Sequence, residues 1–300
     1  MTLALIVNPL AGGGRAGRML ADVRSALHAL DLDHHVEATQ SLEHAQELAR
    51  AAARRGETAV AFGGDGLIGA VAGALRDGLG VLGVLPGGRG NDFARMLGLP
   101  LDPRDACGIL ATGEIRPLDL GQVGPRTFIG IASCGFDSAA NRIANEATLV
   151  RGNLVYAYGA LRALAGWESA QFTVSVDGGA ARTLSGYTVA AANSRYYGGG
   201  MMMAPEASLE DGLLDLVIVS DISRPRFLTL LPTVFRGEHV DHDCVEVIRC
   251  ASVQIAASRP FTMYADGDPI AELPVTVSVL PAAVRTLVPP VTVRAVNLMA

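Results

Sequence analysis

The sequence predicts an α/β protein in which an N-terminal doubly wound parallel-sheet domain is followed by a second, mostly antiparallel β domain. Short apolar strands alternate with helical patterns through the first third of the chain, which is typical of a parallel sheet covered on both faces. After about residue 118, β-branched and alternating segments separated by turns predominate. The length of 300 residues is enough for about two domains.

The expected first domain covers residues 1–118, and its elements follow from hydrophobic periodicity and from helix-start signals. Ser41, followed by Glu43 and Glu47, is typical of the start of a helix. In chain order we expect strands at 3–7, 35–39, 58–62 and 81–85, and helices at 16–30, 41–55 and 67–76.

The expected second domain covers residues 119–286 and consists mainly of strands, with one helical insert at 150–167. Prolines at 281, 289 and 290 mark a link to a last strand at 291–296, so that residues 287–300 are expected to return to the first domain. The strands that we expect in the β domain are 127–133, 171–176, 186–193, 213–220, 245–255, 261–265 and 275–280.

Composition excludes several classes of protein. All 24 basic residues are arginine, so a P-loop kinase, a protein kinase and a Schiff-base enzyme, which each need a lysine, are excluded. A bound phosphate would therefore be held by arginine, backbone N–H groups or a metal. The net charge of −6 argues against a nucleic-acid partner.

The four cysteines are scattered, with no C-x-x-C pair, and we interpret them as small buried apolar residues. The start of the chain carries no signal-peptide pattern, and no segment has about 18 uninterrupted apolar residues. These observations predict a cytoplasmic protein, which could still contact a bilayer.

Three glycine-rich loops each follow a predicted strand of the first domain: residues 8–15, 63–66 and 86–92. The carboxyl ends of parallel strands share one edge of the sheet, so the loops are expected to lie together there. Glycines allow a backbone to approach a phosphate, and Asp65 and Asp92 would bind Mg²⁺ directly or through water. Taken singly, each loop could instead be a plain strand-to-helix turn, and Asp92 a helix cap.

The loops also carry a family resemblance. The segments N-P-L-A-G-G-G-R, G-G-D-G-L-I and P-G-G-R-G-N-D-F-A-R resemble, in order and spacing, the nucleotide loops of the diacylglycerol kinase family of lipid kinases. Residues 193–219, which include D-G-L-L-D, and Ala265-Asp266-Gly267-Asp268 resemble two further signatures of that family. The resemblance covers nearly the whole chain.

The resemblance implies ligands for many of these residues. It places a nucleotide-associated Mg²⁺ on Asp65 and Asp92, and a structural Mg²⁺ on Asp211 with backbone oxygens of Ser208 and Leu213. Arg15 could supply positive charge to a bound phosphate. The expected nucleotide contacts are Asn8, Pro9, Ala11, Gly12, Arg15, Thr39, Gly63, Gly64, Asp65, Gly66, Gly88, Arg89, Asn91 and Asp92.

Three carboxylates are the expected catalytic residues by this resemblance: Asp266, Asp268 and Asp137. The chain departs from the family pattern at Leu67 and Arg89, where threonine is usual, and at Asp268, where glutamate is usual. The shorter side chain draws the Asp268 carboxylate back by about 1.5 Å. We therefore assign the general base, which takes the proton of the acceptor hydroxyl, to Asp266.

Other conspicuous segments leave alternatives open. Residues 238–243 resemble a run of metal ligands, but no second cluster completes a shell, so we expect a solvated connector. Met201–Met203, with Tyr196 and Tyr197, would line an acyl-chain groove or belong to the core. The insert at 150–167 has the composition of a helix at a bilayer interface, or of a buried or dimer-forming helix.

The function that the sequence predicts is an ATP-dependent lipid kinase that transfers the γ-phosphoryl group to a hydroxyl of a diacylglycerol-like lipid, with Mg²⁺ as cofactor. It would lie at the inner face of the membrane as a peripheral protein with transient membrane contact, and the resemblance implies a homodimer. The alternatives are a soluble-substrate kinase similar to NAD kinases and a catalytically silent homologue that senses a nucleotide.

Overall fold

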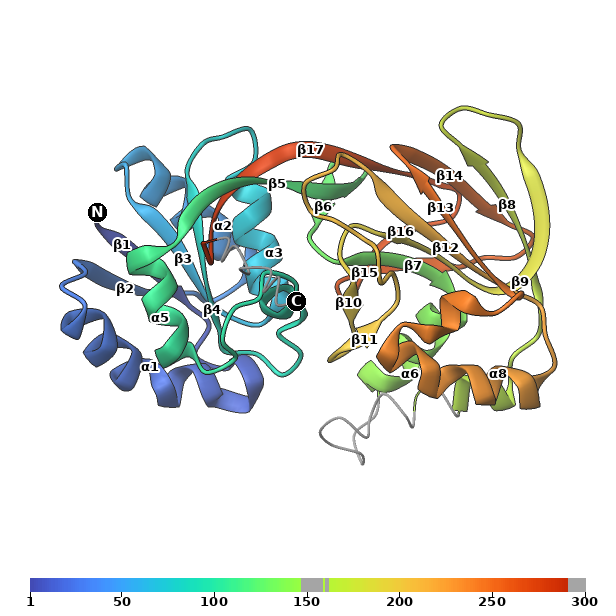
Figure 1. Cartoon of the computed structure of the whole chain (residues 1–300), viewed down its shortest axis with the longest axis horizontal. Coiled ribbons are helices and arrows are strands. Elements are labelled where there is room, and N and C mark those ends of the chain that lie inside the picture. Colours follow the sequence, from blue (N-terminus) through green and yellow to red (C-terminus); the bar gives the residue numbers. More distant parts are fainter. Residues whose placement is uncertain (147–158, 160–161, 291–300) are drawn as a thin grey trace, which may run out of the picture.

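A computed structural model describes residues 1–146, 159 and 162–290, and it shows two domains side by side (Figure 1). The first domain has a parallel sheet in the order β4-β3-β1-β2. Its strands are β1 (Leu3–Val7), β2 (His34–Ala38), β3 (Thr58–Gly63) and β4 (Val81–Pro86), and its helices are α1 (Ala11–Ala29), α2 (Leu42–Arg54), α3 (Asp65–Ala74), α4 (Asp92–Met96) and α5 (Pro103–Thr112).

Helices cover both faces of this sheet, as a doubly wound fold requires. Along β1, Ala4 and Ile6 pack in the cluster that contains the buried alanines of α2 and the apolar face of α3. Leu3, Leu5 and Val7 pack in the cluster that contains buried residues of α1 and α5. The strand is buried on both sides, which explains why it is a continuous apolar run.

Local signals set the helix starts. The Ser41 hydroxyl accepts a hydrogen bond from His44 N at 3.1 Å and caps α2 as expected. α1 begins at Ala11, five residues before the expected start, but Gly12, Gly13 and Gly14 have φ between 62° and 84°. This first segment is a left-handed glycine turn rather than regular helix, because only glycine adopts such angles without strain.

The second domain is an antiparallel assembly, with helices on one side (Figure 1). The strands follow the order β16-β15-β7-β9-β8-β14-β17, while β12 pairs with β9 and β13. The principal strands are β6 (Arg126–Phe128), β7 (Ile131–Gly135), β8 (Ala170–Val176), β9 (Arg182–Ala192), β12 (Leu214–Ser220), β13 (Val245–Cys250), β14 (Ser252–Ala257), β15 (Thr262–Ala265) and β16 (Asp268–Glu272).

Smaller elements complete this domain. The strands β10 (Tyr196–Tyr197) and β11 (Met201–Met202) form a separate antiparallel pair. The helical elements are α6 (Phe136–Glu146), α8 (Arg224–Leu230) and two 3₁₀ turns, Leu231–Arg236 and Glu238–Asp241.

Two long strands join the domains. β5 (Glu114–Val123) pairs antiparallel with β17 (Val275–Val288), and both run across the top of the molecule (Figure 1). The last part of β17 also pairs parallel with β4, through Arg285 and Thr286, so one sheet is continuous through both domains. β5 was not predicted, and the expected strand at 275–280 ends eight residues before β17 does, because Pro281 was interpreted as the start of a link.

Two expected strands are each divided in the structure. The strand expected at 127–133 is interrupted at Ile129 and Gly130, whose N–H groups bind the carboxylate of Asp266. The strand expected at 245–255 is interrupted at Ala251, because its N–H binds the carboxylate of Asp177. In both places a side chain replaces the neighbouring strand as hydrogen-bond acceptor, which periodicity does not reveal.

Several expectations about packing can be compared with the structure. All four cysteines are buried, as expected. The expected solvated connector at 238–243 is wrong for His239, which is 1% exposed and has Nε2 3.0 Å from the carbonyl oxygen of Met203. Met203 belongs to the core, whereas Met201 and Met202 form β11.

Two expected elements lie wholly or largely outside the described residues. They are the strand at 291–296 and most of the helix at 150–167. Among the helices that the structure describes, none is long and apolar enough to cross a membrane.

Candidate active site

The three glycine loops lie together at the carboxyl edge of the parallel sheet and touch through their backbones. A Cβ on Gly12 would lie 2.6 Å from the carbonyl oxygen of Gly87, and a Cβ on Gly88 would collide with Cα of Gly64. Any larger residue at these positions would force the loops apart. The convergence expected from the strand order is therefore present, and it depends on glycine at the contacts.

Asp65 and Asp92 stand at the starts of α3 and α4, and their carboxylates face each other. Oδ1 of Asp65 accepts a hydrogen bond from Phe93 N at 3.0 Å. Asp92 is 8% exposed; its Oδ1 binds Arg95 Nη1 at 3.0 Å and its Oδ2 binds Gly199 N at 2.8 Å. The last bond joins the two domains, because Gly199 belongs to the β domain.

Burial raises the pKa of the Asp92 carboxyl, and the negative charge of Asp65 raises it further. The two carboxylates approach a common point: a Cβ on Gly90 would lie 3.2 Å from Oδ2 of Asp65 and 3.3 Å from Oδ2 of Asp92. Arg95 already pairs with Oδ1 of Asp92, and a further cation at the point that the two Oδ2 atoms approach would balance the charge of Asp65.

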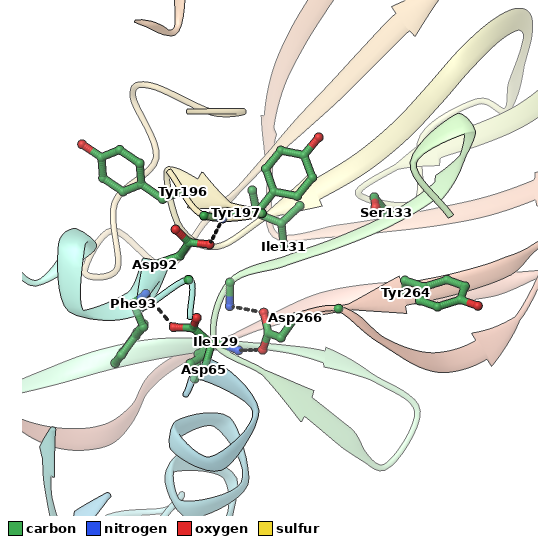
Figure 2. Close-up of a pocket in the computed structure, with 15 residues that line it drawn as sticks. Asp65, Asp92, Phe93, Ile129, Ile131, Ser133, Tyr196, Tyr197, Tyr264 and Asp266 are labelled. Carbon is green, nitrogen blue, oxygen red and sulfur yellow. Dashed lines mark hydrogen bonds between the residues drawn. The ribbon is translucent and has the colours of Figure 1, made fainter. Parts of the chain in front are cut away.

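Asp266 reaches the same place from the β domain (Figure 2). Its backbone has φ of 52°, and its carboxylate accepts hydrogen bonds from Ile129 N at 2.9 Å and Gly130 N at 2.8 Å. Burial raises the pKa of Asp266 to about 7, with a further contribution from the charge of Asp65, while the backbone donors oppose the shift. A carboxyl with this pKa can exchange a proton near neutral pH.

A stripe of glycines on α3 allows the β domain to approach this closely. A Cβ on Gly66 would lie 3.8 Å from Oδ2 of Asp268, and one on Gly69 would lie 3.5 Å from Oδ2 of Asp266. A Cβ on Gly73 would collide with Oγ1 of Thr127. Sequence analysis missed Gly69 and Gly73, although their spacing places them with Gly66 on one helix face.

A cavity of about 110 Å³ lies where these residues meet. Tyr196 and Tyr197 supply part of its wall, which makes them candidate site residues rather than only core or groove residues. Figure 2 shows Asp65 and Asp92 on one side of it and Asp266 on the other. Its lining is Asp65, Gly90, Asp92, Phe93, Ile129, Gly130, Ile131, Ser133, Tyr196, Tyr197, Gly198, Gly199, Tyr264, Asp266 and Gly267.

Other expected nucleotide residues lie at the loop edge but do not line this cavity. Asn8 uses its Oδ1 to accept Leu10 N at 3.0 Å, which shapes the first loop. Thr39, at the end of β2, donates its hydroxyl hydrogen to the carbonyl oxygen of Ser41. Arg15 binds the carbonyl oxygen of Leu101, and Arg89 is exposed. Contact of these residues with a nucleotide stays a prediction.

Asp268 and Asp137 differ in their surroundings and do not line the cavity. Asp268 is exposed at the start of β16. Burial raises the pKa of Asp137 to about 7, against the opposing effect of the hydroxyls of Thr188 and Tyr197. Oδ2 of Asp137 has no hydrogen-bond partner among the described residues. Asp137 therefore lies next to Tyr197, a residue of the cavity wall, and not in the wall itself.

The residues expected to hold a structural Mg²⁺ share one turn. Asp211 accepts Leu213 N at 3.1 Å through Oδ1 and pairs with Arg249 at 3.2 Å through Oδ2, while Ser208 accepts Glu210 N. The charge of Asp211 is thus paired with that of Arg249. A structural Mg²⁺ at this position stays a prediction.

Sequence analysis missed Asp119, a buried residue of β5 that ties three segments together. Its Oδ2 accepts Gly212 N and its Oδ1 accepts Ala282 N, both at 2.7 Å. The amide of Asn193 also binds the carbonyl oxygen of Asp119. The apolar neighbours of Asp119 in the strand were the available signal, because a buried carboxylate needs partners.

The carboxylates of the cavity fit a Mg²⁺ that is shared with a phosphate. Within the described part of the chain, no group of three or more His, Cys, Asp or Glu side chains forms a complete metal site. Asp65 and Asp92 provide a close acidic pair whose repulsion a cation would relieve. Mg²⁺ is usually held in this way, by one or two carboxylates with substrate phosphates and water.

Backbone loops suited to phosphate, an acidic pair and a partly buried carboxylate from a second domain define a class of protein, the two-domain phosphotransferases. The comparisons with known proteins make the class specific. Residues 2–123 match the family described as "Diacylglycerol kinase catalytic domain", and residues 130–288 match "YegS C-terminal NAD kinase beta sandwich-like domain".

The chain belongs to the diacylglycerol kinase family. It is 34% identical over 292 residues to a diacylglycerol kinase of Mycobacterium tuberculosis (strain ATCC 25618 / H37Rv), an alignment that covers 95% of this chain and 94% of the relative. Membership identifies a kinase that acts on a lipid, a phosphotransferase with an alcohol group as acceptor.

Solved structures support the fold. A putative diacylglycerol kinase from Bacillus anthracis str. Sterne matches with a TM-score of 0.80 at 22% identity, covering 96% of this chain and 97% of that one. An NAD kinase from Archaeoglobus fulgidus in complex with ATP matches with a TM-score of 0.52 at 13% identity, covering 96% of this chain and 93% of that one.

Proposed function

We propose that the protein transfers the γ-phosphoryl group of ATP to a hydroxyl of a diacylglycerol-like lipid. The observation that carries the proposal is the meeting of Asp65 and Asp92, from two phosphate-accommodating loops, with Asp266 from the other domain. The partly buried carboxylate of Asp266 lies beside the acidic pair, where a proton acceptor for an attacking hydroxyl is needed.

The nucleotide would lie along the loop edge of the first domain. Residues 8–15 and Thr39 would contact its outer part, while the loops at 63–66 and 88–92 would hold the phosphates near the cavity. Asp65 and Asp92 would hold Mg²⁺, which when bound supplies positive charge that stabilises the transferred phosphoryl group. The exposed Arg89 would add charge where the family usually has a hydroxyl.

The acceptor would approach from the β domain. Its hydroxyl oxygen forms the new bond to the γ-phosphorus, its proton passes to a carboxylate oxygen of Asp266, and the bond between the γ-phosphorus and the β–γ bridging oxygen breaks, which releases ADP. The backbone N–H groups of Ile129 and Gly130 hold Asp266 in position for this transfer. The exposed carboxylate of Asp268 would assist this proton transfer from the solvent side of the turn.

A lipid acceptor also requires access to a bilayer, so we propose transient contact with the membrane through the β domain. Leu228 and Phe235, on α8 and the turn after it, are 42% and 58% exposed and offer apolar contact. The homodimer implied by the family resemblance stays a prediction.

The test is a phosphotransfer assay with purified protein, ATP and Mg²⁺ in mixed micelles that contain diacylglycerol, ceramide, a sphingoid base or a polyprenol-type alcohol. Phosphorylation of at least one lipid, lost in Asp65→Asn, is the expected result. Nucleotide binding without transfer to any acceptor would contradict the proposal and favour a nucleotide-sensing homologue.

The likeness to an NAD kinase fold supports one further candidate, a kinase for a soluble dinucleotide. A parallel assay with NAD in place of lipid decides between the two. If NADP forms faster than any phosphorylated lipid does, the acceptor is a soluble dinucleotide and not a lipid.

A further inference from the structure

A second cavity of about 370 Å³ lies in the β domain beside α6. Its wall includes Arg162 and Arg259, and no aspartate or glutamate is among its described lining residues. The whole chain has a net charge of −6, so the positive charge of these two side chains, with no negative one among the described lining residues, is a local reversal of charge.

Elsewhere in the protein many arginines are neutralised by carboxylates, as Arg55 is by Glu57 at 2.8 Å and Arg182 by Glu246 at 2.6 Å. Arg259 has a different environment. It donates to the carbonyl oxygen of Glu168 at 2.6 Å, and its Cζ lies 5.3 Å and 4.8 Å from the ring centroids of Trp167 and Phe261. These contacts orient the guanidinium but leave its charge uncompensated.

The hydrogen-bond donors of this wall are the guanidinium groups of Arg162 and Arg259. Trp167 is 6% exposed and contributes its ring, over which the Arg259 guanidinium lies. Guanidinium donors suit an anionic oxygen ligand.

Apolar groups line the rest of the cavity. Ala139, Ile143 and Ala163 contribute aliphatic surface beside the rings of Trp167 and Phe261. A small hydrophilic anion would leave this surface unused, whereas a phosphate attached to a hydrocarbon body would contact both parts.

The cavity adjoins the candidate active site through one residue. Tyr264 lines both cavities and stands on β15, two residues before Asp266. In Figure 2 its hydroxyl points away from Asp266. A ligand in the second cavity would therefore lie behind the acceptor side of the catalytic pocket.

We infer that this cavity binds the phosphate of an anionic phospholipid, with Arg162 and Arg259 on the phosphate and the apolar wall on the lipid body. The site is separate from phosphotransfer: it would anchor the β domain at an anionic bilayer surface next to the pocket that receives the acceptor. The inference stands on the cavity itself and does not require the proposed kinase reaction.

The test uses the one tryptophan of the chain as a reporter, because it lies in the cavity wall. The intact protein, without nucleotide, is titrated with phosphatidylcholine vesicles, with vesicles that also contain phosphatidylglycerol, and with soluble glycerol 3-phosphate. We expect a change in Trp167 fluorescence and co-sedimentation only with a phosphate-bearing anionic ligand.

A double variant, Arg162→Gln with Arg259→Gln, should weaken binding to the anionic vesicles roughly 25-fold, from about fivefold for each arginine. The matched control is Arg24→Gln with Arg50→Gln, which removes the same charge from exposed positions on α1 and α2. Arg162→Gln alone serves if loss of the Arg259 contacts impairs folding, since Arg162 is exposed.

The titrations with vesicles and with glycerol 3-phosphate distinguish a membrane phospholipid from a soluble phosphate ester. Binding to phosphatidylglycerol vesicles that glycerol 3-phosphate does not displace supports a membrane phospholipid. Saturable binding of glycerol 3-phosphate, lost in the double variant, supports the phosphate site but assigns it to a soluble ester. Equal weakening by both double variants, or no fluorescence change with either anionic ligand, overturns the inference. Because nucleotide is absent, none of these results depends on the phosphotransfer assay.

Discussion

The two domains place their carboxylates in the candidate site by different means. In the parallel domain, Asp65 and Asp92 each begin a helix directly after a strand and a glycine loop. In the antiparallel domain, Asp266 has a left-handed backbone conformation and is held by N–H groups at the break between β6 and β7. The first arrangement is local in sequence, whereas the second joins segments more than 130 residues apart.

This difference has a chemical consequence. Asp65 and Asp92 stand at helix N-termini and close to each other, which suits the binding of a cation and phosphate. Asp266 is partly buried and its pKa is raised to about 7, which suits the exchange of a proton. The binding groups thus come from one domain and the proton acceptor from the other.

The largest effect is expected from removal of charge on the binding side. Asp65→Asn keeps an oxygen for the Phe93 N–H bond but removes the charge that faces Asp92. The rate of phosphotransfer should fall at least about 10³-fold with little change in melting temperature. The control is Asp22→Asn at an exposed position on α1, and equal activity of the two variants would show that the loop edge does not hold the phosphates.

The next comparison is between the two carboxylates of the β-domain turn. Asp266→Asn should lower kcat by about 10² to 10³, the contribution of a general base. Asp268→Asn should lower it only about tenfold, because the exposed carboxylate is better screened. Circular dichroism and melting curves check the fold, since the new amide NH₂ would oppose a backbone N–H. A larger loss of kcat in Asp268→Asn would move the base to Asp268.

A substitution of Asp137 tests whether burial of this carboxyl in the β domain lowers the free energy of unfolding. The folded pKa is about 7 and the ordinary value 3.8, so from about pH 4 to pH 7 the unfolded chain ionises while the folded protein keeps the proton. The wild type therefore loses stability as pH rises through this window and changes little above it.

Asp137→Asn removes that dependence. The free energy of unfolding of the variant, relative to that of the wild type, should increase from pH 4 to pH 7 and reach an advantage of about 3 kcal/mol. Denaturant unfolding at several pH values measures the effect. A difference that does not vary with pH would show that Asp137 is ionised in the folded protein.

The smallest effects concern two glycines. Gly90→Ala places a methyl group 3.2 Å from Asp65 Oδ2 and 3.3 Å from Asp92 Oδ2, so kcat/KM should fall about tenfold. Gly108→Ala, in α5, meets nothing within 4 Å and should instead raise the free energy of unfolding by up to about 1 kcal/mol. Unchanged kinetics in Gly90→Ala would place the phosphates away from the acidic pair.

The sequence allowed prediction of much of the parallel domain because its signals are local. Buried runs such as residues 3–7, the Ser41 cap and the strand-glycine-helix order all lie within a few residues of each other. The resemblance added Asp266, whose surroundings no local pattern indicates. The interrupted strand at Ile129 was not predictable, because the group that binds its N–H lies 137 residues away.

By itself, the sequence determined the fold class, the three glycine loops and the residue types that phosphate and Mg²⁺ require, since each depends on neighbours along the chain. Only the tertiary structure decided which of the carboxylates share a cavity. It placed Asp266 beside Asp65, Asp268 in solvent and Asp137 behind Tyr197. Burial and the approach of like charges set a carboxyl's pKa, and both arise only when distant segments pack together.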